Sequence, residues 1–281
     1  IDKMKRYTIG KVYRKETTNK KIERLREFHQ ADFDFVGKYD TNLSEIKIFM
    51  MVNMIFKKLK IENYKIKFNF RQLLFEYVVN IAGIEEEDFS SVCSSIDKLD
   101  KKSWEEIQPE LYEKCISMEK INKIKECLDS KMIPESTDCK VNELYVDLMN
   151  KIDEYQITNI EFDNSLARGL DYYTGIIFEI KIDGFNSSVG GGGRYDNLIS
   201  KYDSKMNIDM IGISFGLDRL LNFINVDEKI TKTLVVMTII QNTTEEDRNN
   251  MNKIKASVIK NIMDNTDYAI DFSFDDKKTR K

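Results

Sequence analysis

A regular alternation of polar and apolar side chains runs through residues 28–37. Successive side chains of a β-strand point to opposite faces, so this period of two predicts a strand. Its polar face would carry Gln30, Asp32 and Asp34, and its apolar face Ala31, Phe33 and Phe35. Residues 7–14 predict a second strand, and the charged stretch between the two predicts a long hairpin loop. Such a polar face either lies in water, as in many antiparallel sheets, or forms part of a binding site.

A second alternating run, residues 176–182, follows a stretch that is rich in polar groups. Within residues 167–175, Arg168, an acid and two adjacent tyrosines lie close to Gly169 and Gly175. Glycine lets the backbone turn sharply, and arginine, carboxylate and phenol groups can each fix one atom of a small polar ligand. The stretch therefore predicts a ligand pocket at the start of a strand. A surface loop with a paired arginine and packed tyrosines is the alternative.

The chain from about residue 44 to residue 160 has the apolar spacing of helices. Ser44 is the expected N-cap of the first helix, and residues 64–69 predict a short strand. Four amphipathic segments follow, at residues 71–82, 86–99, 104–115 and 119–128. Because Lys and Glu dominate their polar positions, these segments predict a mostly helical unit with a solvated face.

Four successive glycines, Gly190 to Gly193, lack the spacing of a nucleotide-binding P-loop. They predict a turn from a strand into a helix at residues 194–201, with room for a ligand. A later strand predicts a helix that begins near Leu217 and holds Arg219 in its first turn, where helix ends attract phosphate. Beyond about residue 228, a βαβ unit is predicted by a strand at 234–240, a helix at 245–263 and a strand at 268–274.

Composition limits the function further. The length of 281 residues suits roughly two domains of ~100 to 200 residues each, and a hydrophobic share of 41% is enough for a buried core. A formal net charge of −4 argues against binding nucleic acid through bulk positive charge. Four cysteines without a CxxC pair favour reduced thiols and no metal site, and the lone His29, among phenylalanines, is expected to be packed. Without an apolar stretch of ~18 residues, we expect a soluble, intracellular protein.

Four parts of the chain, in order, resemble the class II aminoacyl-tRNA synthetases, and in detail histidyl-tRNA synthetases of the eukaryotic cytosolic type. Residues 7–16 and 24–34 resemble the second signature motif of that class. Residues 167–179 are similar to the histidine-specific motif of the family. The resemblance continues through residues 189–196 (VGGGGRYD) and 211–220 (IGISFGLDRL).

The resemblance implies an α+β fold. Residues 1–50 and 161–227 would form the antiparallel catalytic core, residues 51–160 a helical insertion, and residues 228–281 the truncated start of an α/β anticodon-binding domain. It also implies that the chain is a fragment without the N-terminal part of such an enzyme, which includes the first class II motif. The implied partners of the full-length protein are L-histidine, ATP, tRNA(His) and a second copy in a homodimer. The implied location is the cytoplasm, with no membrane partner.

The implied activity is that of an aminoacyl-tRNA ligase, which joins the carboxylate of L-histidine to the α-phosphorus of ATP and then transfers histidine to tRNA(His). Negative charge builds on the phosphate oxygens as pyrophosphate leaves, so fixed cations are needed. A guanidinium can bind two oxygens at once. The resemblance assigns the catalytic role to Arg14, Arg168 and Arg219. ATP, as a substrate with Mg²⁺, would be bound by Arg14, Glu16, Arg24, Phe28 and Arg219, and the acceptor end of the tRNA by Arg26.

Recognition of histidine calls for carboxylates, an amide and phenols, because the ligand offers an ammonium group and two imidazole nitrogens. The resemblance implies Gln30 and Asp34 for the ammonium end, and Tyr172, Tyr173 and Tyr195 for the imidazole. Neighbouring side chains of a strand cannot both face one pocket, so packing is the alternative for Tyr172. The alternative function is a catalytically inactive synthetase-like domain that regulates or senses tRNA. The presence of all three arginines favours the enzyme.

Overall fold

The computed structural model describes residues 3–15, 25–39, 42–130 and 139–224, with a few single positions between 244 and 261. The chain divides into two compact units, residues 1–224 and 225–281. The strands predicted at 234–240 and 268–274 lie outside the described residues. The positions described within 245–263 are helical. The anticodon-binding domain predicted from residue 228 therefore stays a prediction.

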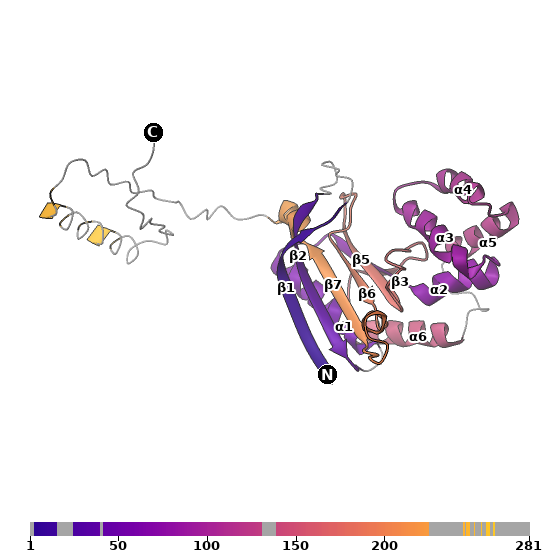
Figure 1. Cartoon of the computed structure of the whole chain (residues 1–281), viewed down its shortest axis with the longest axis horizontal. Coiled ribbons are helices and arrows are strands. Elements are labelled where there is room, and N and C mark those ends of the chain that lie inside the picture. Colours follow the sequence, from indigo (N-terminus) through magenta and orange to yellow (C-terminus); the bar gives the residue numbers. More distant parts are fainter. Residues whose placement is uncertain are drawn as a thin grey trace. The chain divides into compact units, whose positions relative to one another are not determined.

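Within the described residues, the first unit is built on a seven-stranded sheet with the order β1-β2-β7-β6-β5-β3-β4. The strands are β1 (Lys3–Tyr13), β2 (Glu27–Gly37), β3 (Tyr64–Phe70), β4 (Ile160–Phe162), β5 (Ile176–Ile182), β6 (Gly190–Arg194) and β7 (Met210–Gly216). Neighbouring strands run antiparallel, apart from β3 and β4 (Figure 1). The predicted antiparallel sheet and α+β fold class are confirmed.

The strand register places side chains from five neighbouring strands on one face of the sheet. Asp34 pairs with Gly212, Gly212 with Gly193, and Gly193 with Ile177. Side chains alternate between faces along each strand, so residues two apart share a face. We call the face that carries Asp34 the polar face. Its members include Gln30, Asp32, Asp34, Lys67, Glu179, Lys181, Gly191, Gly193, Gly212 and Ser214.

The opposite face is apolar and packs against two helices, α1 (Leu43–Lys58) and α6 (Cys139–Glu154). Phe49 of α1 meets Phe178 of β5 edge to face, with 5.4 Å between ring centroids. Ala31 and Phe35 are buried in this core, and Phe33 packs against it. The predicted division of β2 into an apolar and a polar face is thus confirmed.

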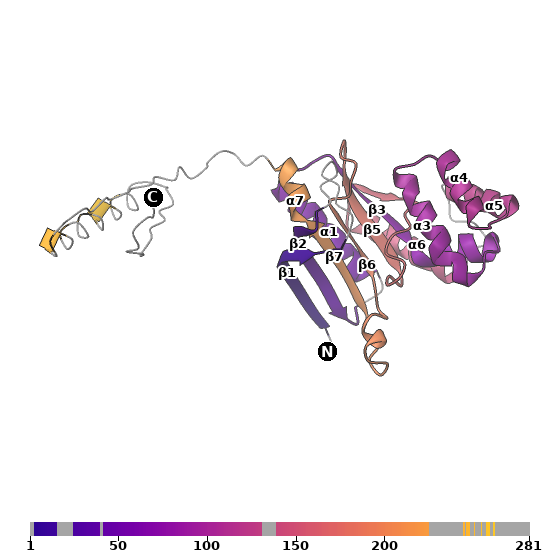
Figure 2. The same ribbon diagram turned by 45° about the horizontal axis from the view of Figure 1, so that its top comes forward.

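A second layer of helices covers the β5 end of the polar face. It comprises α2 (Arg71–Phe75) with the π-helical turn Glu76–Ile81, α3 (Phe89–Ile96), the 3-10 helix η4 (Asp97–Asp100), α4 (Trp104–Glu113) and α5 (Met118–Asp129) (Figure 2). Their core includes Val78, Ile107 and Ile124, and it reaches the sheet at Ile177. The helical segments predicted after residue 70 are confirmed. The limits of the insertion stay a prediction, and β3 and α6 within it belong to the sheet and its apolar core. None of the described helices is long and apolar enough to cross a membrane.

Two local predictions are wrong. The N-cap of α1 is Asn42, whose backbone lies in the left-handed region at φ 57°, while Ser44 lies inside the helix. The helix predicted at 194–201 does not form. Gly190–Arg194 is the strand β6, and within the predicted range it is followed only by a 3-10 helix at Ile199–Lys201. The glycines belong inside the sheet because a Cβ atom at Gly192 would lie 2.1 Å from the carbonyl oxygen of Gly212.

The helix predicted to begin near Leu217, directly after a strand, is confirmed. Strand β7 ends at Gly216, and the short helix α7 (Leu217–Leu220) follows at once. Arg219 lies in its only turn, next to the end of β2 that begins with Glu27.

Candidate functional site

Glycines of β6 and β7 leave part of the polar face without side chains, and we call this part the glycine floor. Ring side chains from the segments before β5 and after β6 lie over it. A Cβ atom at Gly193 would lie 2.8 Å from the ring of Tyr173. One at Gly212 would lie 2.8 Å from the hydroxyl oxygen of Tyr195. Any larger residue at either position would displace these rings, so the glycines set the depth of the site.

Asp34 and Tyr195 form a direct hydrogen bond across this floor. The Tyr195 hydroxyl donates to Oδ1 of Asp34, and Nε of Arg6 lies 3.3 Å from Oδ2. Burial and the bond to Asp34 raise the pKa of Tyr195, so the phenol stays protonated and remains a donor. A carboxylate oriented in this way is suited to an ammonium group.

Tyr172 and Tyr173 lie in a turn and not in a strand. The turn begins at Gly169, whose φ of 66° suits glycine, and both tyrosine N–H groups donate to its carbonyl oxygen. Their ring centroids are 4.2 Å apart, and that of Tyr173 is 6.5 Å from that of Tyr195. The restriction on neighbouring strand residues therefore does not apply to this pair. Burial raises the pKa of Tyr173, which keeps this phenol neutral.

Arg168 and Arg219 converge on Ser188 in the loop between β5 and β6. Nη1 of Arg168 donates to the Ser188 hydroxyl at 3.0 Å, and Nη1 of Arg219 donates to its carbonyl oxygen at 2.7 Å. Arg168 also lies over the floor, 3.8 Å from the Cβ position of Gly191. Two guanidinium groups held on one loop create a local positive potential that can attract an anionic ligand.

Glu179 was not predicted as a site residue, although it anchors Arg168. Nη1 of Arg168 donates to Oε2 of Glu179, whose residue is only 4% exposed. Burial raises the pKa of this carboxyl, and the Arg168 guanidinium acts in the opposite direction. The signal in the sequence was an acid inside the mostly apolar strand at 176–182, where a buried charge requires a partner.

Arg14 and Phe28 lie at the end of the polar face that is next to α7. The Arg14 guanidinium stacks on Phe28, with 4.9 Å from Cζ to the ring centroid. The backbone N–H of Arg14 donates to the carbonyl oxygen of Arg26 at 2.9 Å, which extends the β1–β2 pairing. Gln30 pairs with Gly216, so it lies at this end as well. The predicted ATP-binding residues Glu16 and Arg24 lie outside the described residues.

The prediction that His29 is a packed side chain is wrong. Its side chain is 47% exposed, and Nδ1 lies 3.4 Å from Oδ1 of Asp218 at the start of α7. The backbone N–H of His29 also donates to Oδ2 of Asp218 at 2.6 Å. His29 belongs to the apolar face by its position in β2, but this end of the strand lies next to α7 and outside the buried core.

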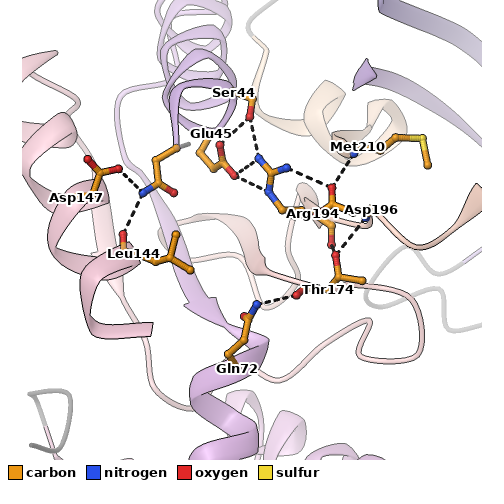
Figure 3. A network of polar contacts seen from close by, with 10 residues as sticks. Ser44, Glu45, Gln72, Leu144, Asp147, Thr174, Arg194, Asp196 and Met210 are labelled. Atoms are coloured by element: carbon orange, nitrogen blue, oxygen red, sulfur yellow. Dashed lines mark hydrogen bonds and ion pairs between the residues drawn. The ribbon is translucent and has the colours of Figure 1, made fainter. Parts of the chain in front are cut away.

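A network around Arg194 supports the loops that carry the tyrosines (Figure 3). Nε of Arg194 donates to Oε1 of Glu45 at 2.9 Å, and Nη2 donates to the Ser44 hydroxyl at 2.9 Å. Nη1 donates to Oδ1 of Asp196 at 3.2 Å. Burial alone would lower the pKa of Arg194, but Glu45 and Asp196 raise it above its ordinary value. The ion pair fixes the end of β6 directly before Tyr195.

The same network reaches the tyrosine turn through Thr174. The Asp196 N–H donates to the Thr174 hydroxyl at 3.1 Å, and the Thr174 N–H donates to the Arg194 carbonyl oxygen at 2.7 Å. Gln72 of α2 donates to the Thr174 carbonyl oxygen at 2.8 Å, as Figure 3 shows. The segments before and after the floor are therefore tied to one another and to two helices.

Within the part of the chain that the structure describes, no group of three or more His, Cys, Asp or Glu side chains is arranged to hold a metal ion. Of the predicted site residues that are described, the structure brings together two sets. One set is Asp34, Tyr172, Tyr173 and Tyr195, and the other is Arg168 with Arg219. Gln30, Arg14 and Phe28 lie at the α7 end of the same face, with Arg26 beside them.

Comparison with known proteins gives a consistent family. The family model for histidyl-tRNA synthetase matches residues 3–220. The chain is 36% identical over 267 residues to "Histidine--tRNA ligase, cytoplasmic" of Oryza sativa subsp. japonica, and this covers 85% of the chain and 33% of that relative. It is 33% identical over 300 residues to "Histidine--tRNA ligase" of Caenorhabditis elegans, with coverage of 92% and 57%. The chain thus spans between a third and just over half of these relatives.

Among solved structures, the fold matches the histidyl-tRNA synthetase of Nostoc sp. PCC 7120 with a TM-score of 0.69. The match covers 98% of this chain and 65% of that one, at 22% sequence identity. At this identity, the likeness supports the shared fold alone.

Proposed function

The chain belongs to the histidyl-tRNA synthetase family, and on this premise we propose that the protein containing it is a histidine--tRNA ligase. It activates L-histidine with ATP to give histidyl-adenylate and pyrophosphate, and then transfers histidine to tRNA(His). The observation that carries the proposal is the convergence of Arg168 and Arg219 on Ser188 over the polar face that holds the Asp34–Tyr195 pair.

ATP is proposed to bind at the α7 end of the polar face. Phe28 offers a ring face for the adenine, and Arg14 stacks on the same ring. Arg168, Arg14 and Arg219 bind phosphate oxygens and stabilise the negative charge that develops during attack by the carboxylate. Glu16 and Arg24 are proposed to complete this site from outside the described residues. Mg²⁺ is proposed to enter with ATP, because it is usually bound through substrate phosphates and few protein ligands.

Histidine is proposed to bind over the glycine floor. Asp34 and Gln30 bind its ammonium group, and Tyr172, Tyr173 and Tyr195 surround the imidazole. The neutral phenols offer both hydrogen-bond donors and acceptors to the two ring nitrogens. Such a site rejects amino acids without the matching groups, because its buried polar atoms would be left unpaired.

The remaining parts of the proposal concern partners. Arg26, exposed at the end of the β1–β2 hairpin loop directly before β2, is proposed to contact the acceptor end of the tRNA. The whole protein is proposed to be a cytoplasmic homodimer. Relatives from Oryza sativa and Arabidopsis thaliana are named as cytoplasmic enzymes, which supports this location.

Histidine-dependent exchange of pyrophosphate into ATP tests the activity in the natural protein that contains this chain. Arg168→Ala is expected to abolish exchange and leave the circular dichroism spectrum unchanged. Lys123→Ala is the control, because Lys123 pairs with Glu119 on the surface at 2.9 Å. A near-normal rate for Arg168→Ala would refute its role. No exchange in the unmodified protein would favour the inactive tRNA-sensing alternative.

A further inference from the structure

Glu179 presents its two carboxylate oxygens to two different cations. Oε2 accepts a hydrogen bond from Arg168, and Oε1 lies 3.4 Å from Nζ of Lys181. Glu179 and Lys181 are two residues apart in β5, so both side chains belong to the polar face. The buried acid therefore links Lys181 to a guanidinium of the proposed phosphate site.

Lys181 also has a partner in the helical layer. Its Nζ atom forms an ion pair with Oδ1 of Asp100 in η4, and its side chain is only 19% exposed. Charges of alternating sign thus run from Asp100 through Lys181 and Glu179 to Arg168. Through this row of ion pairs, η4 is connected to the guanidinium group of Arg168.

The row borders a cavity of about 380 Å³ between η4 and the sheet. Asp97, Lys98 and Asp100 line it from the helical side, and Arg168 and Glu179 line it from the other. The boundary at this point is polar and open. Asp100, which pairs with Lys181, is therefore one of the residues that line this polar cavity.

We propose that Lys181 is a positioning residue for histidine activation, which keeps Glu179 ionised and turned toward Arg168, and that Asp100 holds Lys181 in place. The inference rests on the proposed function, because it gives Lys181 a role only through the phosphate-binding Arg168. It also makes η4 part of the machinery of activation.

The charges around Glu179 act in both directions on its carboxyl group, so a further cation beside it matters. Burial raises the pKa of Glu179, and Asp97 and Asp163 act in the same direction. Arg168 and Lys67 lower it. Burial lowers the pKa of Lys181 to about 8, so at neutral pH its ammonium group, 3.4 Å from Glu179, favours the ionised carboxylate by its position. A neutral Glu179 would lose its ion pair with Arg168 and leave the guanidinium free to turn away.

Pyrophosphate exchange by two variants of Lys181 tests the proposal. Lys181→Met keeps the length of the side chain and removes its charge, so kcat is expected to fall about tenfold or more with little change in the KM for histidine. Because Glu179 would protonate more easily, the acid limb of the kcat profile is expected to move to higher pH. Lys181→Arg keeps the positive charge, so its kcat and the acid limb of its pH profile are expected to match those of the unmodified protein.

Lys65→Met is the matched control. Lys65 pairs with Lys181 across the β3–β5 register and shares its face, but its partner is Glu161 at 2.7 Å and its side chain is 54% exposed. It is expected to leave kcat and the pH profile unchanged. Asp100→Asn is a second variant, milder for folding, and it is expected to shift kcat and the acid limb in the same direction as Lys181→Met.

A readout without activity separates this inference from the proposed function. The Arg168 Nε–H signal in ¹⁵N NMR spectra, assigned through Arg168→Lys, is expected to shift and to exchange faster with water in Lys181→Met. An unchanged Arg168 signal would overturn the inference, whether or not the unmodified protein catalyses exchange. With an active protein, an unchanged kcat and pH profile in Lys181→Met would overturn it as well.

Discussion

Tyr195 donates its hydroxyl hydrogen to Asp34, although the two residues are 161 positions apart in the chain. Asp34 comes from β2, and Tyr195 follows β6, with β7 lying between these strands. The bond is possible because Gly212 of β7 has no side chain at the point where the two groups meet. It joins an acid and a phenol into one binding element for the proposed amino-acid substrate.

Tyr195→Phe is expected to weaken histidine binding about tenfold, because an acceptor without its donor costs ~1–3 kcal/mol. Asp34 would keep its ion pair with Arg6 but lose the bond that orients its other oxygen. Calorimetric titration with histidine measures the change. Tyr202→Phe is the control, since Tyr202 is 88% exposed. Equal affinity in the two variants would contradict the role of the Tyr195 hydroxyl.

Local patterns in the sequence predicted strands β2 and β5 of this site well. The alternation at 28–37 placed Gln30 and Asp34 on one face, and the apolar spacing predicted the helical layer. Both patterns arise from the geometry of a single element, so they need no knowledge of distant partners. The resemblance indicated which polar residues are candidates for ligand binding, but the roles of these residues stay predictions.

The errors came where a distant partner decides the local structure. Ser44 has the chemistry of an N-cap, yet its hydroxyl accepts a hydrogen bond from Arg194, 150 positions away. The glycines at 190–193 have the composition of a turn, but in the sheet they allow β6 to approach its neighbours. Glu179 was not predicted because its partner Arg168 lies in a loop. A loop has no periodic pattern of side-chain directions from which the contact could be predicted.

Gly192→Ala is expected to destabilise the protein by ~3 kcal/mol or more, since overpacking inside a sheet forces the backbone to move. The added methyl group would lie 2.1 Å from a backbone oxygen of β7 and 2.7 Å from the Phe178 ring. Gly10→Ala in the edge strand β1 is the control, because none of the described residues comes within 4 Å of that position. Urea unfolding compares the two variants. A similar loss of stability in both would show that glycine in a strand, and not close packing, sets the cost.

Arg194→Met is expected to lower the free energy of unfolding by about 3–5 kcal/mol, because it leaves the buried Glu45 carboxylate without its cation. The double variant Arg194→Met with Glu45→Met is expected to lose less than the sum of the two single changes. Denaturant unfolding of all four proteins measures this coupling. Lys123→Met is the surface control and is expected to cost below ~1 kcal/mol. Additive losses from Arg194→Met and Glu45→Met would show that the pair does not act as one unit.

Glu110 is expected to make the helical layer sensitive to acid. Its carboxylate accepts hydrogen bonds from Lys98 at 2.5 Å and from the Ser95 hydroxyl at 2.6 Å, and these partners lower its pKa to about 2. A depressed pKa means that the ionised form stabilises the folded state. This contribution is full above the ordinary value of 4.5 and is lost as the pH falls toward about 2.

Glu110→Gln removes this titration and keeps the shape of the side chain. The unmodified protein is expected to be more stable than the variant at pH 6, and the difference is expected to shrink steadily as the pH falls to about 3. Urea unfolding at several pH values measures both proteins. Glu119→Gln is the control, because its partner Lys123 holds a carboxylate that is 77% exposed and contributes little. A stability difference for Glu110→Gln that stays constant with pH would mean that the bonds to Lys98 and Ser95 do not depend on the charge of Glu110.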